Sequence, residues 1–178
     1  KGRSYFIYRK KTKDKNNLFH YYANKENTVS IDKISPKDID TGIKPVDMFT
    51  FYCKTQGTDI NYAIDSLKIL GIENIYQMKR KDLKENEEEE NKGTLKKIYM
   101  AASLNQKCET IVINDFVKGE SRTFEKQFIN LLLKMESQKK TIVYLSTEPY
   151  ETIDWKTQFH DELPEKEILI NLKDVSFR

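Results

Sequence analysis

Two short apolar runs in the second half of the chain carry the clearest structural pattern. Residues 110–114 (Thr-Ile-Val-Ile-Asn) and 141–146 (Thr-Ile-Val-Tyr-Leu-Ser) are rich in β-branched side chains and have the length of buried strands. Between them, residues 121–137 repeat apolar side chains at spacings of three and four, which places these side chains on one face of a helix. Strand, helix and strand in this order predict a βαβ unit, and therefore an α/β fold with a parallel sheet.

Weaker patterns predict further elements upstream. Three helices are expected, over residues 46–54, 60–70 and about 94–104. Gly71 follows the second of them and suits the left-handed backbone position at which many helices end. Residues 19–34 are expected to form short strands, and the alternation of apolar and polar side chains is clearest over residues 28–31.

The composition is that of a folded domain with a charged surface. A chain of 178 residues fits one domain, and ten Tyr and nine Phe supply apolar area for its core. The 31 basic and 28 acidic residues are interleaved, so the net charge of +3 indicates no particular partner. The basic run at residues 9–15 and the acidic run at residues 87–90 are interpreted as solvated surface. Two cysteines without a CxxC pair favour a reducing, cytosolic compartment, and no apolar run approaches the roughly 20 residues that cross a bilayer.

Polar side chains follow the first of the two predicted strands. Asn114 and Asp115 stand where the carboxyl end of a parallel strand is expected, and open α/β sheets bind ligands at that edge. An acid at this place either caps a following helix or holds Mg²⁺ and water beside a phosphate. The residues of this segment alone leave both interpretations open.

The segment around these residues resembles a motif of the ATP-binding domains of ABC transporters. Residues 110–121 are similar to the Walker B strand and the D-loop, which usually read as four apolar residues, Asp-Glu-Pro and a short loop. In that alignment Asn114 takes the place of the Asp that supports Mg²⁺ through water, and Asp115 takes the place of the catalytic Glu. The resemblance makes Asp115 the candidate catalytic carboxylate and Asn114 a candidate nucleotide and metal ligand.

Two further motifs of the same family have altered counterparts here. Residues 90–104 resemble the ABC signature and its helix, with Gly93 at the second glycine but Asn91 and Lys92 in place of the Ser and the first glycine. Such changes would damage the backbone nest that grips a phosphate. Glu148 stands where the family has its switch His, and a carboxylate cannot donate a hydrogen bond to a phosphate.

The first residues of the chain resemble the end of a Walker A loop. Gly2, Arg3 and Ser4 are followed by the apolar residues 5–8, as when the final Gly-Lys-Ser of the loop enters its helix. The resemblance implies that these three residues bind nucleotide and that Ser4 is a metal ligand together with Asn114. Arg3 in place of Lys would fit poorly between two phosphates because its guanidinium is larger and forked.

Residues 42–57 resemble the entry into the helical subdomain of the family. Just before it, residues 34–36 (Ile-Ser-Pro) stand where the Q-loop Gln is expected. Residues 48–52 fall where the family contacts its permease, but Phe49 and Phe51 are each expected in the core because large apolar side chains are usually buried.

The resemblance implies a P-loop NTPase-like parallel sheet with helices on both faces and an ABC-type helical subdomain. One such domain is expected over residues 1–178, with the helical subdomain at about residues 42–104. Because five catalytic positions are altered together, the implied function is that of a pseudo-ATPase with ATP and Mg²⁺ as candidate ligands. Its implied partners are a permease subunit and a second ATP-binding domain, as a homodimer or a heterodimer. Its implied location is cytoplasmic and peripheral, at the inner face of the cell membrane.

Two other functions are left open by the sequence. One is a weakly active ATP-hydrolysing enzyme that uses Asp115 as a shortened carboxylate and Ser4 on Mg²⁺. The other is a free-standing protein-interaction domain. Nucleic acid is not expected as a partner, since Tyr21, Tyr22 and the nearby lysines form no recognised binding motif.

Overall fold

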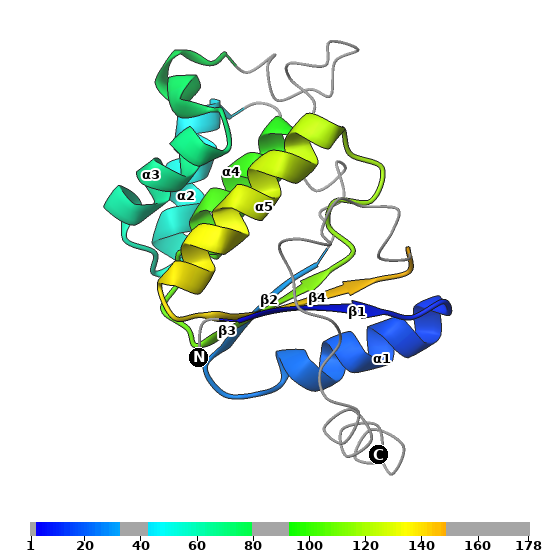
Figure 1. Ribbon diagram of the computed structural model, residues 1–178. Coiled ribbons are helices and arrows are strands. Elements are labelled where there is room, and N and C mark those ends of the chain that lie inside the picture. Colours follow the sequence, from blue (N-terminus) through cyan, green and yellow to red (C-terminus); the bar gives the residue numbers. More distant parts are fainter. Residues whose placement is uncertain (1–2, 33–42, 80–92, 149–178) are drawn as a thin grey trace. The chain divides into compact units, whose positions relative to one another are not determined.

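A computed structural model describes residues 3–32, 43–79 and 93–148 of the chain. The chain divides into two compact units, which are coloured by sequence in Figure 1. The sheet unit comprises Lys1–Lys33, Cys108–Lys118 and Leu132–Arg178, and the helical unit comprises Ile34–Lys107 and Gly119–Leu131. Each unit is described on its own.

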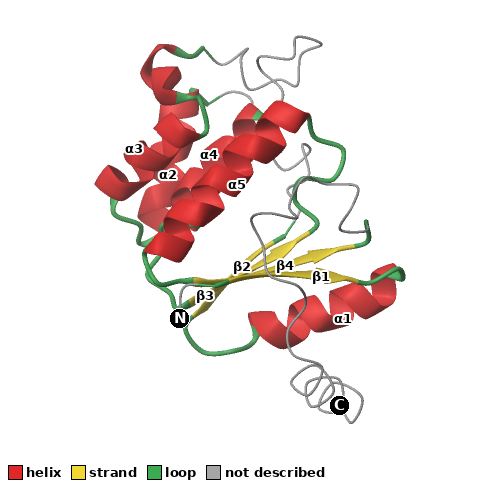
Figure 2. Cartoon of the chain, in the orientation of Figure 1, coloured by secondary structure: helices red, strands yellow, loops and turns green. Residues whose placement is uncertain are grey.

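The sheet unit is built on four parallel strands in the order β1-β4-β3-β2 (Figure 2). They are β1 (Ser4–Tyr8), β2 (Thr28–Ile31), β3 (Thr110–Asn114) and β4 (Thr141–Ser146). Both strands predicted from continuous apolar runs are confirmed with the expected bounds. The two central strands, β3 and β4, are buried over nearly their whole length, which is why their sequences are apolar without alternation.

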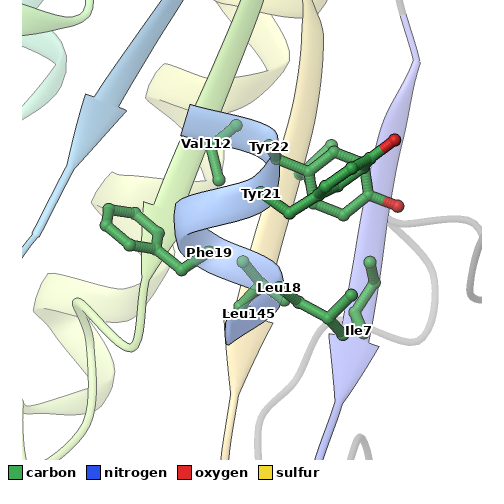
Figure 3. Packing of buried hydrophobic residues seen from close by; sticks show 8 residues of the cluster. Ile7, Leu18, Phe19, Tyr21, Tyr22, Val112 and Leu145 are labelled. Atoms are coloured by element: carbon green, nitrogen blue, oxygen red, sulfur yellow. The ribbon is translucent and has the colours of Figure 1, made fainter. Parts of the chain in front are cut away.

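Helix α1 (Thr12–Ala23) covers one face of this sheet. Figure 3 shows the apolar contact between them, to which Leu18, Tyr21 and Tyr22 contribute from the helix and Ile7, Val112 and Leu145 from three strands. The spacing of the helical residues by three and four brings them to the same side of α1. Three residues, Arg9 to Lys11, join β1 to the helix, so α1 begins beside the carboxyl ends of the strands.

Two sequence predictions about the first quarter of the chain are wrong. Residues 5–8, expected to enter a helix, belong to the strand β1, which pairs with β4. Residues 19–23, expected to form a strand, belong to α1. The aromatic residues Phe19, Tyr21 and Tyr22 favour strands by propensity, but packing of the helical face against the sheet outweighs that weak preference. The strand predicted over residues 28–31 is confirmed.

The helical unit contains the other predicted helices. They are α2 (Pro45–Gln56), α3 (Ile60–Ile69), α4 (Thr94–Ser103) and the first part of α5 (Arg122–Ser137). The unit also contains the short 3₁₀ helix η2 (Glu73–Gln77), which the sequence pattern did not predict. Gly71 has the expected left-handed backbone, with φ of 74°, and follows Leu70, the C-cap residue of α3. The Thr58 hydroxyl ties the start of α3 to α4 by donating to the carbonyl of Ala102 at 2.8 Å. Among the described helices, none is long and apolar enough to cross a membrane.

The two phenylalanines of α2 face opposite environments. Phe49 is fully buried at 0% exposure, as expected, whereas Phe51 is 60% exposed and the expectation of burial is wrong. Two residues apart on a helix are separated by about 200° around its axis, so both cannot face one core. Phe51 lies against the ring of Tyr52, which in turn meets Tyr99 of α4 edge to face. These three side chains form a partly exposed aromatic row on the helical unit.

Both cysteines are free thiols. Burial raises the pKa of Cys53 to about 11. Burial also raises the pKa of Cys108, against the opposing effect of the nearby Lys140 ammonium. Neither thiol is therefore activated as a nucleophile at neutral pH.

Candidate functional site

Polar side chains meet at the carboxyl edge of the sheet unit. Asp115 directly follows β3, Ser146 ends β4, and Thr147 comes next. Lys15 joins them from the first turn of α1. Because the strands are parallel, their carboxyl ends share one edge, where α/β sheets bind ligands.

The Asp115 carboxylate is held by three side-chain donors. The Lys15 ammonium lies 3.4 Å from Oδ2, and the Thr147 hydroxyl donates to the same oxygen at 3.0 Å. The Ser146 hydroxyl donates to Oδ1 at 3.2 Å. The side chains of Lys15 and Asp115 are only 5% and 2% exposed, so the two charges neutralise each other away from water.

The backbone of Asp115 is also constrained. Its φ of 49° lies in the left-handed region, which Asp tolerates better than most residues. Its N–H donates to the carbonyl of Leu145 at 2.8 Å and extends the pairing of β3 with β4 by one residue. The carboxylate and the backbone of Asp115 thus both fasten the end of β3 to β4.

Tyr144 fastens the segment that follows Asp115. The fully buried side chain stacks on Phe6, with ring centroids 5.8 Å apart, and its hydroxyl accepts the Val117 N–H at 3.0 Å. Burial raises the pKa of this phenol well above its ordinary value, so it remains neutral. The segment from Asp115 to Val117 is therefore fixed at both ends to β4.

Replacement of Tyr144 by Phe is expected to lower the free energy of unfolding by about 1–3 kcal/mol. The ring and its stacking would remain, but the buried Val117 N–H would lose its acceptor. Urea unfolding followed by circular dichroism measures the difference. A change below about 0.5 kcal/mol, the usual range for surface substitutions, would mean that this hydrogen bond does not hold the segment.

A second polar group lies beside the first. The Asn114 side-chain NH₂ donates to Asp32 Oδ1 at 3.0 Å and to Asn16 Oδ1 at 3.4 Å. Asn114 is 6% exposed, and its own Oδ1 has no hydrogen-bond partner among the described residues. One amide therefore bridges two oxygens, one from β2's end and one from α1.

Arg3 and Ser4, two of the three predicted Walker A residues, do not lie at this edge. Ser4 begins β1 and pairs with Ile142, whereas Asn114 pairs with Leu145 at the opposite end of β4. At about 3.3 Å per residue, three residues of strand separate the two ends by about 10 Å. The Ser4 hydroxyl donates to Glu136, and the exposed Arg3 precedes it at the same amino edge. Placement of Ser4 on Mg²⁺ beside Asn114 is therefore wrong, and Gly2 lies outside the described residues.

The other predicted site residues fall in both units. Glu148 lies two residues beyond β4, and its N–H donates to the Ser146 hydroxyl at 2.9 Å, so it shares the edge with Asp115. Gly93 belongs to the helical unit, where it precedes α4 with φ of 79°. A Cβ at Gly93 would come within 2.9 Å of the Phe124 ring. The altered signature residues 91 and 92 and the Q-loop position at residues 34–36 lie outside the described residues.

No protein-family model matches the chain, and no curated protein matches it. Solved structures of ABC-type proteins match its fold. A metal-chelate type ABC transporter in an inward-facing conformation is 13% identical, with a TM-score of 0.63 over 85% of this chain and 66% of that one. An archaeal ribosome recycling factor, aABCE1, in complex with the stalk protein aP1 is 14% identical, with a TM-score of 0.55. The RNase-L inhibitor is 16% identical, with a TM-score of 0.51.

These comparisons give the class of fold. The chain has the α/β fold of ABC-type ATP-binding domains, with a parallel sheet as predicted. It spans just under two thirds of the transporter chain and 29% of each of the other two. At 13–16% identity the likeness is one of fold, and the activity and partners of those proteins do not transfer with it.

Lys15 is the site residue that sequence reasoning missed. Residues 9–16 read Arg-Lys-Lys-Thr-Lys-Asp-Lys-Asn and run from the connection after β1 into the first turns of α1. Set against the P-loop pattern G-x-x-x-x-G-K-[ST], they agree at Lys15 alone, with Arg9 and Asp14 at the two glycine positions and Asn16 at the Ser or Thr position. Because the segment lacks both glycines, the place of Lys15 cannot be recognised until the preceding strand, β1, is known.

Proposed function

We propose that this chain is a catalytically degenerate ABC-type subunit, which keeps the fold of an ATP-binding domain and does not hydrolyse ATP. It serves as a structural or regulatory partner of a permease and of a second ATP-binding domain, at the cytoplasmic face of the membrane. The likeness of fold supports the first part of this proposal. The state of Asp115 supports the second.

The main support for the proposal is that the Asp115 carboxylate is already paired with side chains of the protein. A general base must reach the water that it activates, within hydrogen-bonding distance. Asp115 is instead buried, and it accepts hydrogen bonds or charge from Lys15, Ser146 and Thr147. A side chain so engaged is a structural anchor, and β3 supplies no second carboxylate, since Asn114 precedes it.

The connection from β1 to α1 is equally unsuited to a triphosphate. P-loop glycines let backbone N–H groups approach phosphates without obstruction by side chains. Here Arg9 stands at the first of these positions, and its N–H already donates to the carbonyl of Ser146 at 2.9 Å. The Lys15 ammonium, which would bind the β- and γ-phosphates, is paired with Asp115. The residues present therefore do not fit a bound triphosphate.

The negative charges at this edge also oppose the binding of a triphosphate. Asp32, Asp115 and Glu148 lie at the carboxyl ends of three neighbouring strands. Each of these carboxylates that no nearby cation neutralises would repel a phosphate brought there. The alternative of slow hydrolysis with Ser4 on Mg²⁺ also loses its metal ligand, because Ser4 lies at the amino edge.

The partner role rests on the helical unit. Phe51 is 60% exposed in a row with Tyr52 and Tyr99, on the helix α2 where the family resemblance suggests contact with a permease. Exposed aromatic side chains are enriched at protein interfaces because they bury much area with little loss of conformational freedom. The row is the contact surface that we assign to the permease.

Calorimetric titration of the full-length protein with ATP, with and without Mg²⁺, tests the proposal. We expect no binding, or weak binding that Mg²⁺ does not strengthen, since the phosphate-binding lysine is occupied. The absence of binding would indicate a structural subunit, and weak binding that Mg²⁺ does not strengthen would indicate a regulatory nucleotide site. Tight Mg²⁺-dependent binding would contradict the proposal and favour an enzyme.

A further inference from the structure

We propose that the Asn114 amide is a built-in substitute for a metal cation, so that the carboxyl edge of the sheet is complete without Mg²⁺. The inference rests on the proposed function, because it concerns the same edge of the sheet. It goes further by stating what occupies the place of the metal and by predicting that a single substitution creates a metal site.

The Mg²⁺ of P-loop proteins is held by a Ser or Thr hydroxyl of the P-loop and an Asp at the end of the Walker B strand. The corresponding residues here, Asn16 and Asn114, both carry amides. Mg²⁺ takes oxygen ligands at about 2.0–2.1 Å in near-octahedral geometry. In the orientation that the structure shows, the Asn114 NH₂ turns hydrogens and no lone pair toward the oxygens of Asp32 and Asn16, so the space between them does not fit a cation.

The position of the Asn114 NH₂ supplies the stronger argument. It lies 3.0 Å from Asp32 Oδ1 and 3.4 Å from Asn16 Oδ1, between two oxygens that face it from different elements. A cation at this place would bridge the same two oxygens. The NH₂ group has two hydrogens, one for each oxygen, and so it satisfies both acceptors while it excludes the cation.

Asp32 fixes the orientation of this amide. Rotation of the amide by 180° would place Asn114 Oδ1 at about the position of the NH₂, facing a carboxylate oxygen 3.0 Å away. Two acceptors at that distance repel. The NH₂ therefore faces Asp32, and Oδ1 is left without a partner among the described residues.

Lys15 is the side-chain partner of the Asp115 carboxylate, as Asn114 is of the Asp32 carboxylate. Its ammonium is 3.4 Å from the Asp115 carboxylate in a buried pair, so each of these two acidic side chains has a protein donor. Lys15 stands at the lysine of the P-loop pattern, which binds phosphate, and Asn114 stands at the Walker B Asp, which supports the metal. Lys15 neutralises the charge of Asp115, whereas the neutral Asn114 amide gives Asp32 a hydrogen bond and leaves its charge in place.

The substitution Asn114→Asp tests this inference. It replaces the bridging NH₂ by an oxygen, so that Asn16, Asp32 and the new carboxylate present an all-oxygen site, which Mn²⁺ and Mg²⁺ prefer. We expect the full-length N114D protein, without nucleotide, to bind Mn²⁺ at least about 10-fold more tightly than the wild type. The melting temperature of N114D should rise with Mn²⁺ or Mg²⁺, and that of the wild type should not change. Manganese titration followed by electron paramagnetic resonance measures the binding directly.

Two control variants separate the inference from a general effect of added charge. Asn105→Asp makes the same change in the helical unit, where the amide donates to the Ser66 hydroxyl and the Ala101 carbonyl. Asn16→Asp adds a carboxylate beside Asn114 but keeps the bridging NH₂. Neither variant should gain Mn²⁺ affinity, and Asn16→Asp still tests the inference if Asn114→Asp fails to fold.

Three results would overturn the inference. They are Mn²⁺ binding by the wild type that Asp32→Ala abolishes, a folded N114D protein with unchanged Mn²⁺ affinity, and a gain by N16D equal to that of N114D. These measurements contain no ATP, so they fail or succeed independently of the proposed lack of hydrolysis.

Discussion

Replacement of Asp115 by Ala is expected to lower the free energy of unfolding by about 3–5 kcal/mol. The loss would leave the Lys15 ammonium, 5% exposed, without its counter-charge. The hydroxyls of Ser146 and Thr147 would lose their acceptor as well. An exposed catalytic carboxylate would behave in the opposite way, because its removal often leaves stability unchanged or raises it.

A double-mutant cycle identifies the source of this loss. Lys15→Met should cost less than Asp115→Ala, because Asp115 keeps two hydroxyl donors. The combination of both substitutions should recover much of the stability, since no buried charge would then lack a partner. Urea unfolding measures the four proteins, with Asp115→Asn as the control that retains a residue tolerant of the left-handed backbone. A loss below about 1 kcal/mol for Asp115→Ala, the usual value for an exposed ion pair, would contradict the structural role of Asp115.

Replacement of Phe49 by Ala is expected to lower the free energy of unfolding by about 3–5 kcal/mol. Phe49 is fully buried on α2, so truncation removes apolar contacts and leaves a cavity in the helical unit. Thermal unfolding and urea unfolding both measure this change. A loss under about 1 kcal/mol would show that α2 does not supply the core of its unit.

Phe51→Ala is the matched control on the same helix. The residue type and the substitution are identical, but Phe51 is 60% exposed, and the expected change is within about 0.5 kcal/mol. Because Phe51→Ala is expected to leave the fold intact, the same variant can test the permease contact assigned to the aromatic row. A large loss of stability from Phe51→Ala would place that side chain in a core and remove it from the proposed contact.

The sequence predicted the centre of the sheet well for a physical reason. Strands β3 and β4 are buried between neighbours on both sides, so their apolar runs are continuous and have a definite length. Helix α5 was equally clear, because 16 residues provide several repeats of its apolar stripe. Such signals are local and can be read from one segment.

The start of the chain could not be predicted from local patterns. Strand β1 has five residues and lies at the edge of the four-stranded sheet, where only its pairing with β4 identifies it. Once residues 5–8 are taken as a helix, the following residues cannot be recognised as a strand-to-helix connection. That single error placed the P-loop at Ser4 and concealed Lys15.

The candidate site depends on contacts that no local pattern contains. Lys15 meets Asp115 across 100 residues of sequence, and Asp32 meets Asn114 across 82. Asn114 and Asp115 were identified in advance because they stand at the end of a recognisable strand. Their partners were not, because the order of the strands brings them together and that order is absent from the sequence pattern.

Phosphate release from Mg²⁺-ATP by the purified full-length protein, compared with its Asp115→Asn variant, tests the central claim most directly. The account predicts that both proteins release phosphate at the same rate as buffer alone, because Asp115 anchors β3 to β4 and activates no water. Turnover above that background in the wild type, lost in Asp115→Asn while the variant stays folded, would contradict the account and make this chain an ATPase.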